Sequence, residues 1–298
     1  MMTDNLMQSV CDELNARGFD AKIDVIHKHN EDIQGLTIRI PETAISPVIY
    51  PEMIADMYKP GIDIAALTDR VEMQIKGNTP DIDINRINTK EFFINNAALV
   101  LCNADWNRDM LNDTPHEIIP GTDLAVYARI KVSDDASFRP TYGLLEGVGF
   151  TADEIMAAAR ANDKTKYTAR DMNQVMSEMT GIPAEDMPDN RIIVVSNQEC
   201  HNGAAAITDP AIMDTACRML GTTEVYIIPS STHECLVMPD DGTFDANEIR
   251  TMICSVNDTV DMQDRLSDHA YAYSTATRKL TSVQSESQVQ TQTSVRGR

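Results

Sequence analysis

The 298-residue sequence has few aromatic residues, little positive charge and no Cys-x-x-Cys pair. Lys and Arg number 25 against 46 Asp and Glu, which gives a formal net charge of −21. Phosphate backbones are bound by clustered Lys and Arg, and the sequence contains no such cluster. We therefore predict no nucleic-acid partner. The acids are spread along the chain, which is typical of a solvated acidic surface.

Long apolar runs are also missing. The longest, Ala97 to Cys102, is far shorter than the ~20 residues of a membrane-spanning helix. The N-terminus carries acids and lacks the apolar segment of a signal peptide. We therefore expect a soluble, cytoplasmic protein without a membrane partner, whose six cysteines are reduced. Its 17 methionines predict a core filled by flexible thioethers rather than by large rings.

Hydrophobic periodicity predicts a mixture of helices and strands. Helices are expected over 4–17, 64–75, 151–161 and 169–179, and directly after Asp209 and Asp245. Strands are expected over 36–40, 44–50, 123–132, 192–196, 204–207, 224–229 and 234–239, whereas 92–102 fits either a strand or a buried helix. The pattern predicts an α+β fold of mostly antiparallel sheets with packed helices, in two closely associated halves.

The best internal boundary in the sequence is the segment 182–190, which holds two prolines and three acids. It predicts an N-terminal α+β half over 1–182 and a C-terminal half over 183–280 with the order β-β-α-β-β-α. The last residues, 281–298, are rich in Ser, Thr and Gln, and we expect a disordered polar tail there.

The cysteines offer little support for thiol catalysis. Four of them lie on or beside apolar stripes and are predicted to be structural, namely Cys11, Cys102, Cys217 and Cys254. Of the other two, Cys200 lies in a polar loop and Cys235 follows His233-Glu234. A pairing of Cys200 with His233 is geometrically open, but nothing in the sequence fixes the arrangement that a catalytic thiol requires.

Three histidines stand next to a carboxylate in the sequence, in the pairs His116-Glu117, His233-Glu234 and Asp268-His269. Each pair lies near the end of an expected helix or strand, where functional loops concentrate. His116, His233 and His269 are candidate zinc ligands if they converge. No two of these histidines have the i, i+4 spacing that is typical of a metal-ligand pair. The alternative is that the three side chains never meet in the fold, and we predict no cofactor.

Two segments carry a family resemblance. Pro-Ser-Ser-Thr-His-Glu over 229–234 and Ser-Asp-His over 267–269, with the order of the surrounding elements, resemble an uncharacterised bacterial family common in gut anaerobes. The resemblance covers roughly residues 35–280. That family is a domain of unknown function, so the resemblance implies no activity. It directs attention to five residues, which are His116, His233, Glu234, Asp268 and His269.

The sequence leaves several functions open. The first is a non-enzymatic binding or adaptor protein, whose partner is an unknown protein or small molecule. The second is a hydrolase or metal-dependent enzyme in which Glu234 orients His233, with Ser231 as nucleophile or donor and Asp268 and His269 contributing. A third is an interaction protein that uses its acidic surface. The absence of a nucleophile elbow, a phosphate loop or a metal-ligand pair favours the first.

Overall fold

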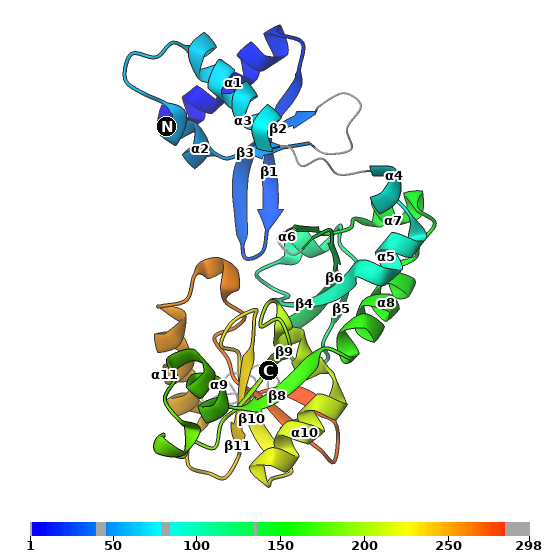
Figure 1. The fold of residues 1–298 in the computed structure, drawn as a ribbon, viewed down its shortest axis with the longest axis vertical. Helices are drawn as coiled ribbons and strands as arrows, with labels where there is room; N and C mark the ends of the chain where they lie inside the picture. Colours follow the sequence, from blue (N-terminus) through cyan, green and yellow to red (C-terminus); the bar gives the residue numbers. More distant parts are fainter. Residues whose placement is uncertain (1, 40–45, 79–83, 134–135, 284–298) are drawn as a thin grey trace, which may run out of the picture. The chain divides into compact units, whose positions relative to one another are not determined.

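The computed structural model describes residues 2–39, 46–78, 84–133 and 136–283 (Figure 1). The chain divides into two compact units, Met1–Thr89 and Lys90–Arg298. Helices and three antiparallel sheets occur together, which confirms the predicted α+β fold. In the described ranges, no helix combines the length and the apolar character needed to cross a membrane.

The first unit packs helices against a small sheet of order β1-β2-β3. The apolar stripe predicted for the N-terminal helix is buried, and Met7, Val10 and Leu14 pack with Leu67 and Val71. Most of the predicted elements of this unit are confirmed, although the first strand has no counterpart in the prediction. The elements are α1 (Met2–Ala16), β1 (Asp20–Lys28), β2 (Glu31–Arg39), β3 (Val48–Ile49), α2 (Pro51–Met57), α3 (Ile64–Asn78) and α4 (Ile84–Ile87).

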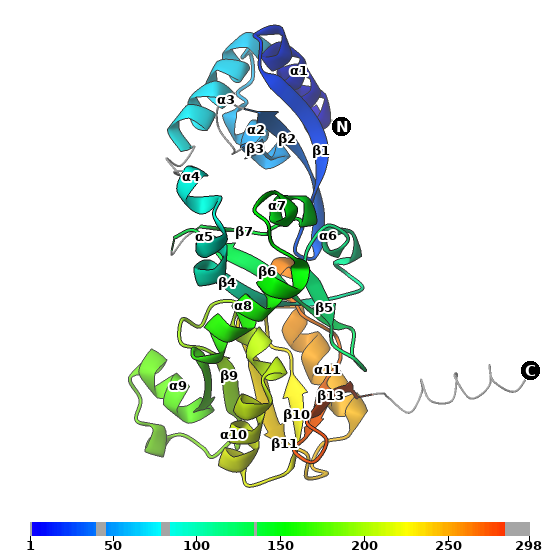
Figure 2. The same cartoon turned by 90° about the vertical axis from the view of Figure 1, so that its right-hand side faces the viewer.

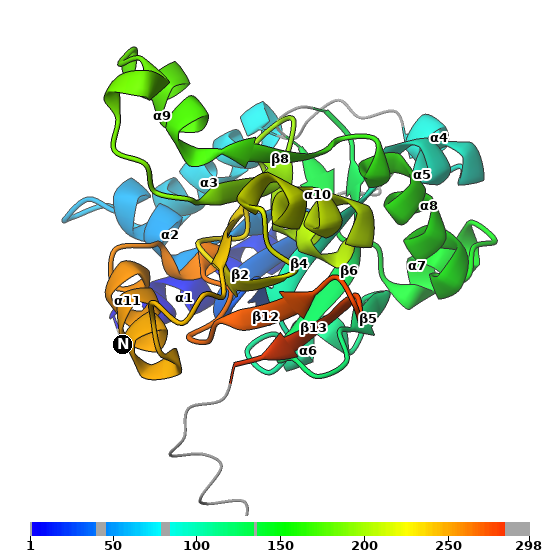
Figure 3. The same ribbon diagram turned by 90° about the horizontal axis from the view of Figure 1, so that it is seen from below.

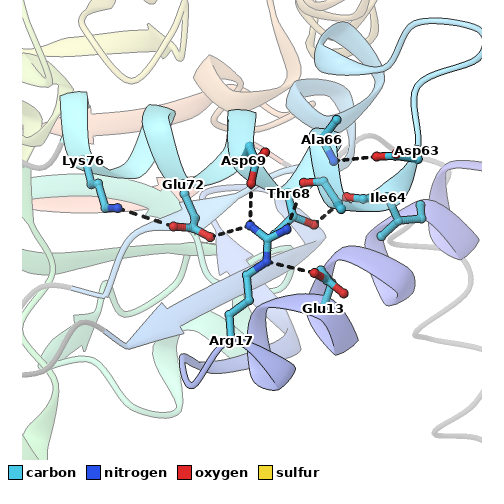
Figure 4. Close-up of polar contacts among 10 residues, drawn as sticks. Glu13, Arg17, Asp63, Ile64, Ala66, Thr68, Asp69, Glu72 and Lys76 are labelled. Carbon is cyan, nitrogen blue, oxygen red and sulfur yellow. Dashed lines mark hydrogen bonds and ion pairs between the residues drawn. The ribbon is translucent and has the colours of Figure 1, made fainter.

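Arg17, which follows α1, connects this helix to α3 (Figure 4). Its guanidinium donates to Glu13 at 2.9 Å, Asp69 at 2.6 Å and Glu72 at 2.8 Å. It also donates to the Ala65 carbonyl at 3.0 Å. Hydrogen bonds to Glu72, Asp69 and Glu13 raise the pKa of Arg17 above its ordinary value. The network thus ties together two helices that also share a buried apolar cluster.

We expect Arg17→Met to lower the urea midpoint of unfolding, because three carboxylates then lose their shared cation. The matched control is Lys76→Met, which loses only a 3.4 Å contact with Glu72. Because exposed ion pairs are screened by salt, the difference between the variants should shrink at high ionic strength. Equal midpoints for both variants at low salt would contradict this role of Arg17.

The second unit begins with a sheet of order β4-β6-β5, with β7 paired to β6. Figure 2 shows α5 and α8 beside this sheet, and both helices contribute to its core. The ambiguous stretch 92–102 is both a helix and a strand, since the chain turns from α5 into β4 at Ala97. The elements are α5 (Lys90–Asn96), β4 (Ala97–Asn103), α6 (Arg108–Leu111), β5 (His116–Ile118), β6 (Leu124–Lys131), β7 (Ser137–Phe138), α7 (Tyr142–Gly147) and α8 (Ala152–Lys164).

A six-stranded antiparallel sheet of order β13-β12-β10-β11-β9-β8 forms the rest of this unit. Its elements in chain order are β8 (Tyr167–Asp171), α9 (Met172–Thr180), η1 (Ala184–Asp186), β9 (Ile193–Asn197), η2 (Gly203–Thr208), α10 (Pro210–Leu220), β10 (Glu224–Ile228), β11 (Cys235–Pro239), α11 (Ala246–Asn257), η3 (Met262–Asp264), β12 (Tyr271–Ser274) and β13 (Lys279–Ser282). The helices α10 and α11 and the β12–β13 hairpin can be followed in Figure 3.

Side-chain alternation along β10 separates two apolar clusters. Val225 and Ile227 belong to the main core with α10, whereas Tyr226 and Ile228 pack with α11. Since successive residues of a strand point to opposite faces, the two helices cover opposite faces of the sheet. The main core also contains buried residues of β4, β6, α8 and η2, so the two sheets of this unit share one core.

Several predictions differ from the structure. The helix expected over 169–179 begins only at Met172, because Ala169 pairs with Val195 in the sheet. The return strand expected over 204–207 is the buried 3-10 helix η2. Cys254, expected to be structural, is exposed.

The division between units also lies elsewhere, after Thr89 rather than after residue 182. The strands on either side of 182 pair with each other, from Tyr167↔Asn197 to Asp171↔Ile193, so no boundary separates them. Residues 281 and 282, assigned to the polar tail, belong to β13. Residue 283 is also described, whereas residues 284–298 of that tail lie outside the described residues.

Candidate functional site

A polar pocket of about 450 Å³ lies in the second unit, where β4, β6, the end of α8 and the loop after β9 meet. Three cationic and two acidic side chains line it, together with amide, hydroxyl and imidazole groups. These residues are Arg129, Lys131, Lys166, Asp163, Glu199, Asn197, Asn202, Ser133, Ser137 and His201. The pocket is unusual for this chain, because cations outnumber acids on its walls whereas acids dominate the whole sequence.

The strand β6 supplies two of the cations. Arg129 and Lys131 alternate with the buried Ala128 and Ile130, so the strand period of two places both cations on one face. Lys131 forms an ion pair with Glu199 from the loop after β9. Arg129 and Lys166 form no ion pair within 4 Å with another described residue, and they remain the cations best placed to meet a ligand.

Asp163 lies in the last turn of α8 and is only 6% exposed. Its Oδ2 accepts a hydrogen bond from the Leu99 backbone N–H at 2.6 Å. Burial raises the pKa of Asp163 to about 6, although the Leu99 bond and the charges of Lys166 and Lys131 lower it. Carboxyl groups with raised pKa values in clefts are typical of binding and catalytic sites.

The loop after β9 carries Glu199, His201 and Asn202 to the pocket in a constrained conformation. Cys200 and Asn202 have positive φ values of 50° and 52°, a region that residues with a Cβ rarely adopt. The Asn197 side chain fixes the turn by accepting from the backbone N–H groups of Glu199 at 3.1 Å and His201 at 3.2 Å. Such a conformation persists only where neighbouring contacts determine it, and it is found at functional sites more often than elsewhere.

The segment 229–234, which carries the family resemblance, holds this loop in place through hydrogen bonds. His233 Nδ1 accepts from the Asn202 N–H at 3.1 Å, and its carbonyl accepts from the Gly203 N–H at 3.1 Å. The same carbonyl accepts from Ser196 Oγ at 2.7 Å, and the Thr232 carbonyl accepts from the Ala204 N–H at 3.1 Å. His233 thus positions the pocket loop rather than lining the pocket.

The rings of His201 and His233 stack with centroids 5.1 Å apart. Burial, then the charges of His233, Arg129 and Lys131, lower the pKa of His201 below its ordinary value. His201 is therefore a neutral imidazole at neutral pH. Because Nδ1 of His233 accepts a hydrogen bond, its neutral form carries the proton on Nε2, which lies 3.5 Å from Asp264 Oδ1.

The structure does not gather the three candidate zinc ligands. His116 lines a separate cavity of about 300 Å³, and its Nδ1 donates to the Thr114 carbonyl at 2.8 Å. In the described part of the chain, no cluster of three metal-binding side chains includes His116, His233 or His269.

The other sequence candidates take part in local hydrogen bonds. Ser231 Oγ accepts from the His233 N–H at 3.1 Å, and the Glu234 carbonyl accepts from the Ser231 N–H at 3.2 Å. Asp268 accepts from Asn257 Nδ2 at 2.8 Å, and the His269 N–H donates to Ser267 Oγ at 3.1 Å. The described residues show no hydrogen bond between the segments 231–234 and 268–269.

The Ser-Asp-His segment has a structural role through Ser267. Asp123, which precedes β6, accepts hydrogen bonds from Asn103, Ser267 and Tyr271. The three donor residues are at most 1% exposed, so the Asp123 carboxylate accepts hydrogen bonds from donor groups that water does not reach. This network links the first sheet of the second unit to β12.

Four cysteines are buried, namely Cys11, Cys102, Cys217 and Cys235. Burial raises the pKa values of Cys102 and Cys235, which keeps both as neutral thiols. Cys200 is exposed, but the His233 Nδ1 next to its loop is already engaged by Asn202. The sequence hypothesis of a Cys200–His233 pair therefore has no hydrogen bond to support it.

Sequence reasoning missed the charged residues of the pocket. It noted the polar loop around Cys200 and His201, and this loop does line the pocket. One signal available in the sequence was the run Asn-Gln-Glu-Cys-His-Asn directly after the apolar strand at 193–196, because polar loops at strand ends often carry function. Asp163 had no such signal, since an acid near a helix end is ordinarily solvated.

Comparison with known proteins gives a family but no activity. A family model described as "Family of unknown function (DUF5688)" matches residues 2–275. No curated protein and no solved structure matches the chain. The predicted resemblance to a domain of unknown function is thereby confirmed, over a longer stretch than 35–280. With nearly its whole length matched, the chain belongs to this family of unknown function, DUF5688.

Proposed function

We propose that the protein is a binding protein for a small organic anion, which occupies the pocket of the second unit. The observation that carries the proposal is the concentration of Arg129, Lys131 and Lys166 in one pocket of a chain with net charge −21. Three cations against two acids leave the pocket with an excess of positive charge, which attracts ligands of the opposite sign. The cavity volume of about 450 Å³ suits a metabolite and lies within the usual range for small-molecule sites.

Each cation has a distinct part in the proposal. Arg129 offers a planar guanidinium that binds a carboxylate or phosphate through two parallel hydrogen bonds. Lys166 adds a second charge from the connection between α8 and β8. Lys131 forms an ion pair with Glu199, so its part is to hold the loop after β9 in place rather than to bind the anion. The same proposal includes a cytoplasmic location, which suits six cysteines that form no disulfide.

Lys166→Met is expected to weaken anion binding by about tenfold or more, the effect of losing one charge-assisted hydrogen bond. The matched control is Lys164→Met, which changes an exposed lysine two residues away that does not line the pocket. A thermal-shift screen of phosphate monoesters and dicarboxylates would identify binders, and calorimetry on both variants would give the affinities.

Two results of that experiment would overturn the proposal. The first is that no phosphate ester or dicarboxylate stabilises the wild-type protein. The second is that a binder is found but Lys164→Met weakens it as much as Lys166→Met does, because the anion would then bind outside the pocket.

A second candidate is an enzyme that carries out acid–base chemistry on the same anion. It is favoured because one pocket holds Asp163 with a raised pKa and His201 with a lowered pKa. Groups with perturbed pKa values in one cleft are typical of catalytic sites. The hydrolase or metal-enzyme alternative built on His233, Glu234, Asp268 and His269 lacks a comparable convergence. Chemical change of a bound anion, followed by NMR and lost in Asp163→Asn, would support the enzyme.

A further inference from the structure

We infer that the anion bound in this pocket also carries a hydrogen-bond donor, an amino or hydroxyl group, which binds to the carboxylate of Asp163. The inference rests on the proposed function and specifies its ligand class. That class is an amino- or hydroxyl-substituted organic phosphate or carboxylate, rather than a plain anion.

The two carboxylate oxygens of Asp163 differ in their hydrogen bonds. Oδ2 accepts the Leu99 N–H at 2.6 Å, whereas Oδ1 accepts no hydrogen bond from a described residue although Asp163 lines the pocket. Oδ1 is not among the described side-chain atoms that are both buried and unpartnered, so it is open to the pocket. A ligand that fills the pocket displaces water from this oxygen, and a donor on the ligand replaces the lost hydrogen bond. The pocket places this oxygen where a ligand can supply the donor.

The nearby cations do not supply a donor to Asp163 Oδ1. Lys131 and Lys166 are close enough to lower the pKa of Asp163, yet neither comes within 4 Å of its carboxylate. Lys131 is bound to Glu199. The pocket therefore contains cations for an anionic group and a separate, unused acceptor. A ligand with only negative groups would leave that acceptor unpaired.

The charge balance around Asp163 agrees with such a donor. Lys131 and Lys166 lower the pKa of Asp163 and Glu199 raises it, but the increase caused by burial is larger than each of these effects. The buried hydroxyl of Tyr167 on β8 has no hydrogen-bond partner among the described residues, and the Asp163 charge helps raise the pKa of this tyrosine. A donor from the ligand would stabilise the carboxylate form of Asp163.

The test uses two ligand series in which only the donor changes. One comprises ethyl phosphate, 2-hydroxyethyl phosphate and 2-aminoethyl phosphate, and the other comprises succinate, malate and aspartate. Calorimetry would compare the wild type with Asp163→Asn. Asparagine still accepts from the Leu99 N–H through its oxygen, but it presents an NH₂ group to the pocket. Asp153→Asn, at the exposed start of α8, is the matched control.

In the wild type, a donor-bearing member of at least one series should bind about tenfold more tightly than the plain anion. Asp163→Asn should reduce this preference below about threefold, most strongly for the amino member, because an ammonium group cannot accept from NH₂. Asp153→Asn should leave the preference unchanged.

Equal binding of all members of both series to the wild type would overturn the inference and leave the proposed anion site standing. A preference that survives in Asp163→Asn would also overturn it, because the donor would then bind elsewhere. If none of the six probes binds saturably, the proposed function itself fails.

Discussion

Replacing Gly203 by alanine is expected to lower the free energy of unfolding by about 3 kcal/mol and to abolish anion binding. A Cβ atom at this position would lie 2.5 Å from the Asn197 nitrogen and 2.9 Å from the His233 carbonyl oxygen, and closer still to Ser196 Oγ. Two of these three atoms belong to the backbone and cannot rotate away. The loop that carries Glu199 and His201 would have to move, and the pocket wall would move with it.

The control for this experiment is Gly143→Ala in α7, where an added Cβ meets no atom within 4 Å. Alanine favours helix over glycine by up to about 1 kcal/mol, so this variant should be unchanged or slightly more stable. Urea unfolding and calorimetric titration would be measured on both variants. If Gly203→Ala retains both stability and anion binding, the loop is not held by Asn197 and His233 as described.

Asp163→Asn is expected to change how stability depends on pH. Since the folded-state pKa of Asp163, about 6, exceeds the unfolded value of 3.8, the folded state holds the proton more tightly. The stability that this group contributes is therefore greatest in acid and is lost as the pH rises through about 6. Between pH 4.5 and 7.5, the stability of the variant relative to the wild type should increase by about 2 kcal/mol.

Urea unfolding of the wild type and Asp163→Asn at several pH values would check this prediction. The comparison cancels the contributions of the other acids, because both proteins carry them in the same environments. Asp153→Asn, whose carboxylate is exposed at the other end of α8, is measured beside it as the matched control. A pH-independent difference between Asp163→Asn and the wild type would show that the Asp163 carboxyl group is solvated in the folded protein.

Helix boundaries in this chain were predictable where a local hydrogen bond defines them. The capping boxes of Thr151 with Glu154 and of Asp245 with Glu248 mark the starts of α8 and α11, and both are present in the structure. Asp209 with Pro210 and the left-handed Gly221 likewise set the limits of α10. These signals involve residues that are close in sequence, so they do not depend on the tertiary fold.

The errors concern segments whose conformation is set by distant partners. Residues 204–207 have the composition of a short buried strand, yet they form η2 because the N–H groups of Gly203 and Ala204 bond to the carbonyls of His233 and Thr232. Residues 169–171 belong to β8 although the local pattern predicts a helix from 169 onward, because the pairing of β8 with β9 joins residues about twenty-five positions apart. Periodicity over a short window does not contain this information.

The candidate site was predictable only in part for the same reason. Sequence motifs pointed to His233, and the structure places it directly behind the pocket loop, in contact with His201. The residues that line the pocket come from β6, the α8–β8 connection and the loop after β9, and no motif joins them. A buried Asp163 in particular is visible only once α8 packs on β4.

The most direct test of the anion-binding proposal is an NMR titration of the ¹⁵N-labelled protein with 2-aminoethyl phosphate, followed through backbone amide resonances. We predict saturable shifts for the amides of Leu99, Glu199, His201 and Asn202, which surround the pocket. The same titration of Lys166→Met should require at least about tenfold more ligand. Saturable shifts confined to residues away from the pocket would contradict the proposal, as would the absence of any saturable amide shift with this ligand and with the other five probes.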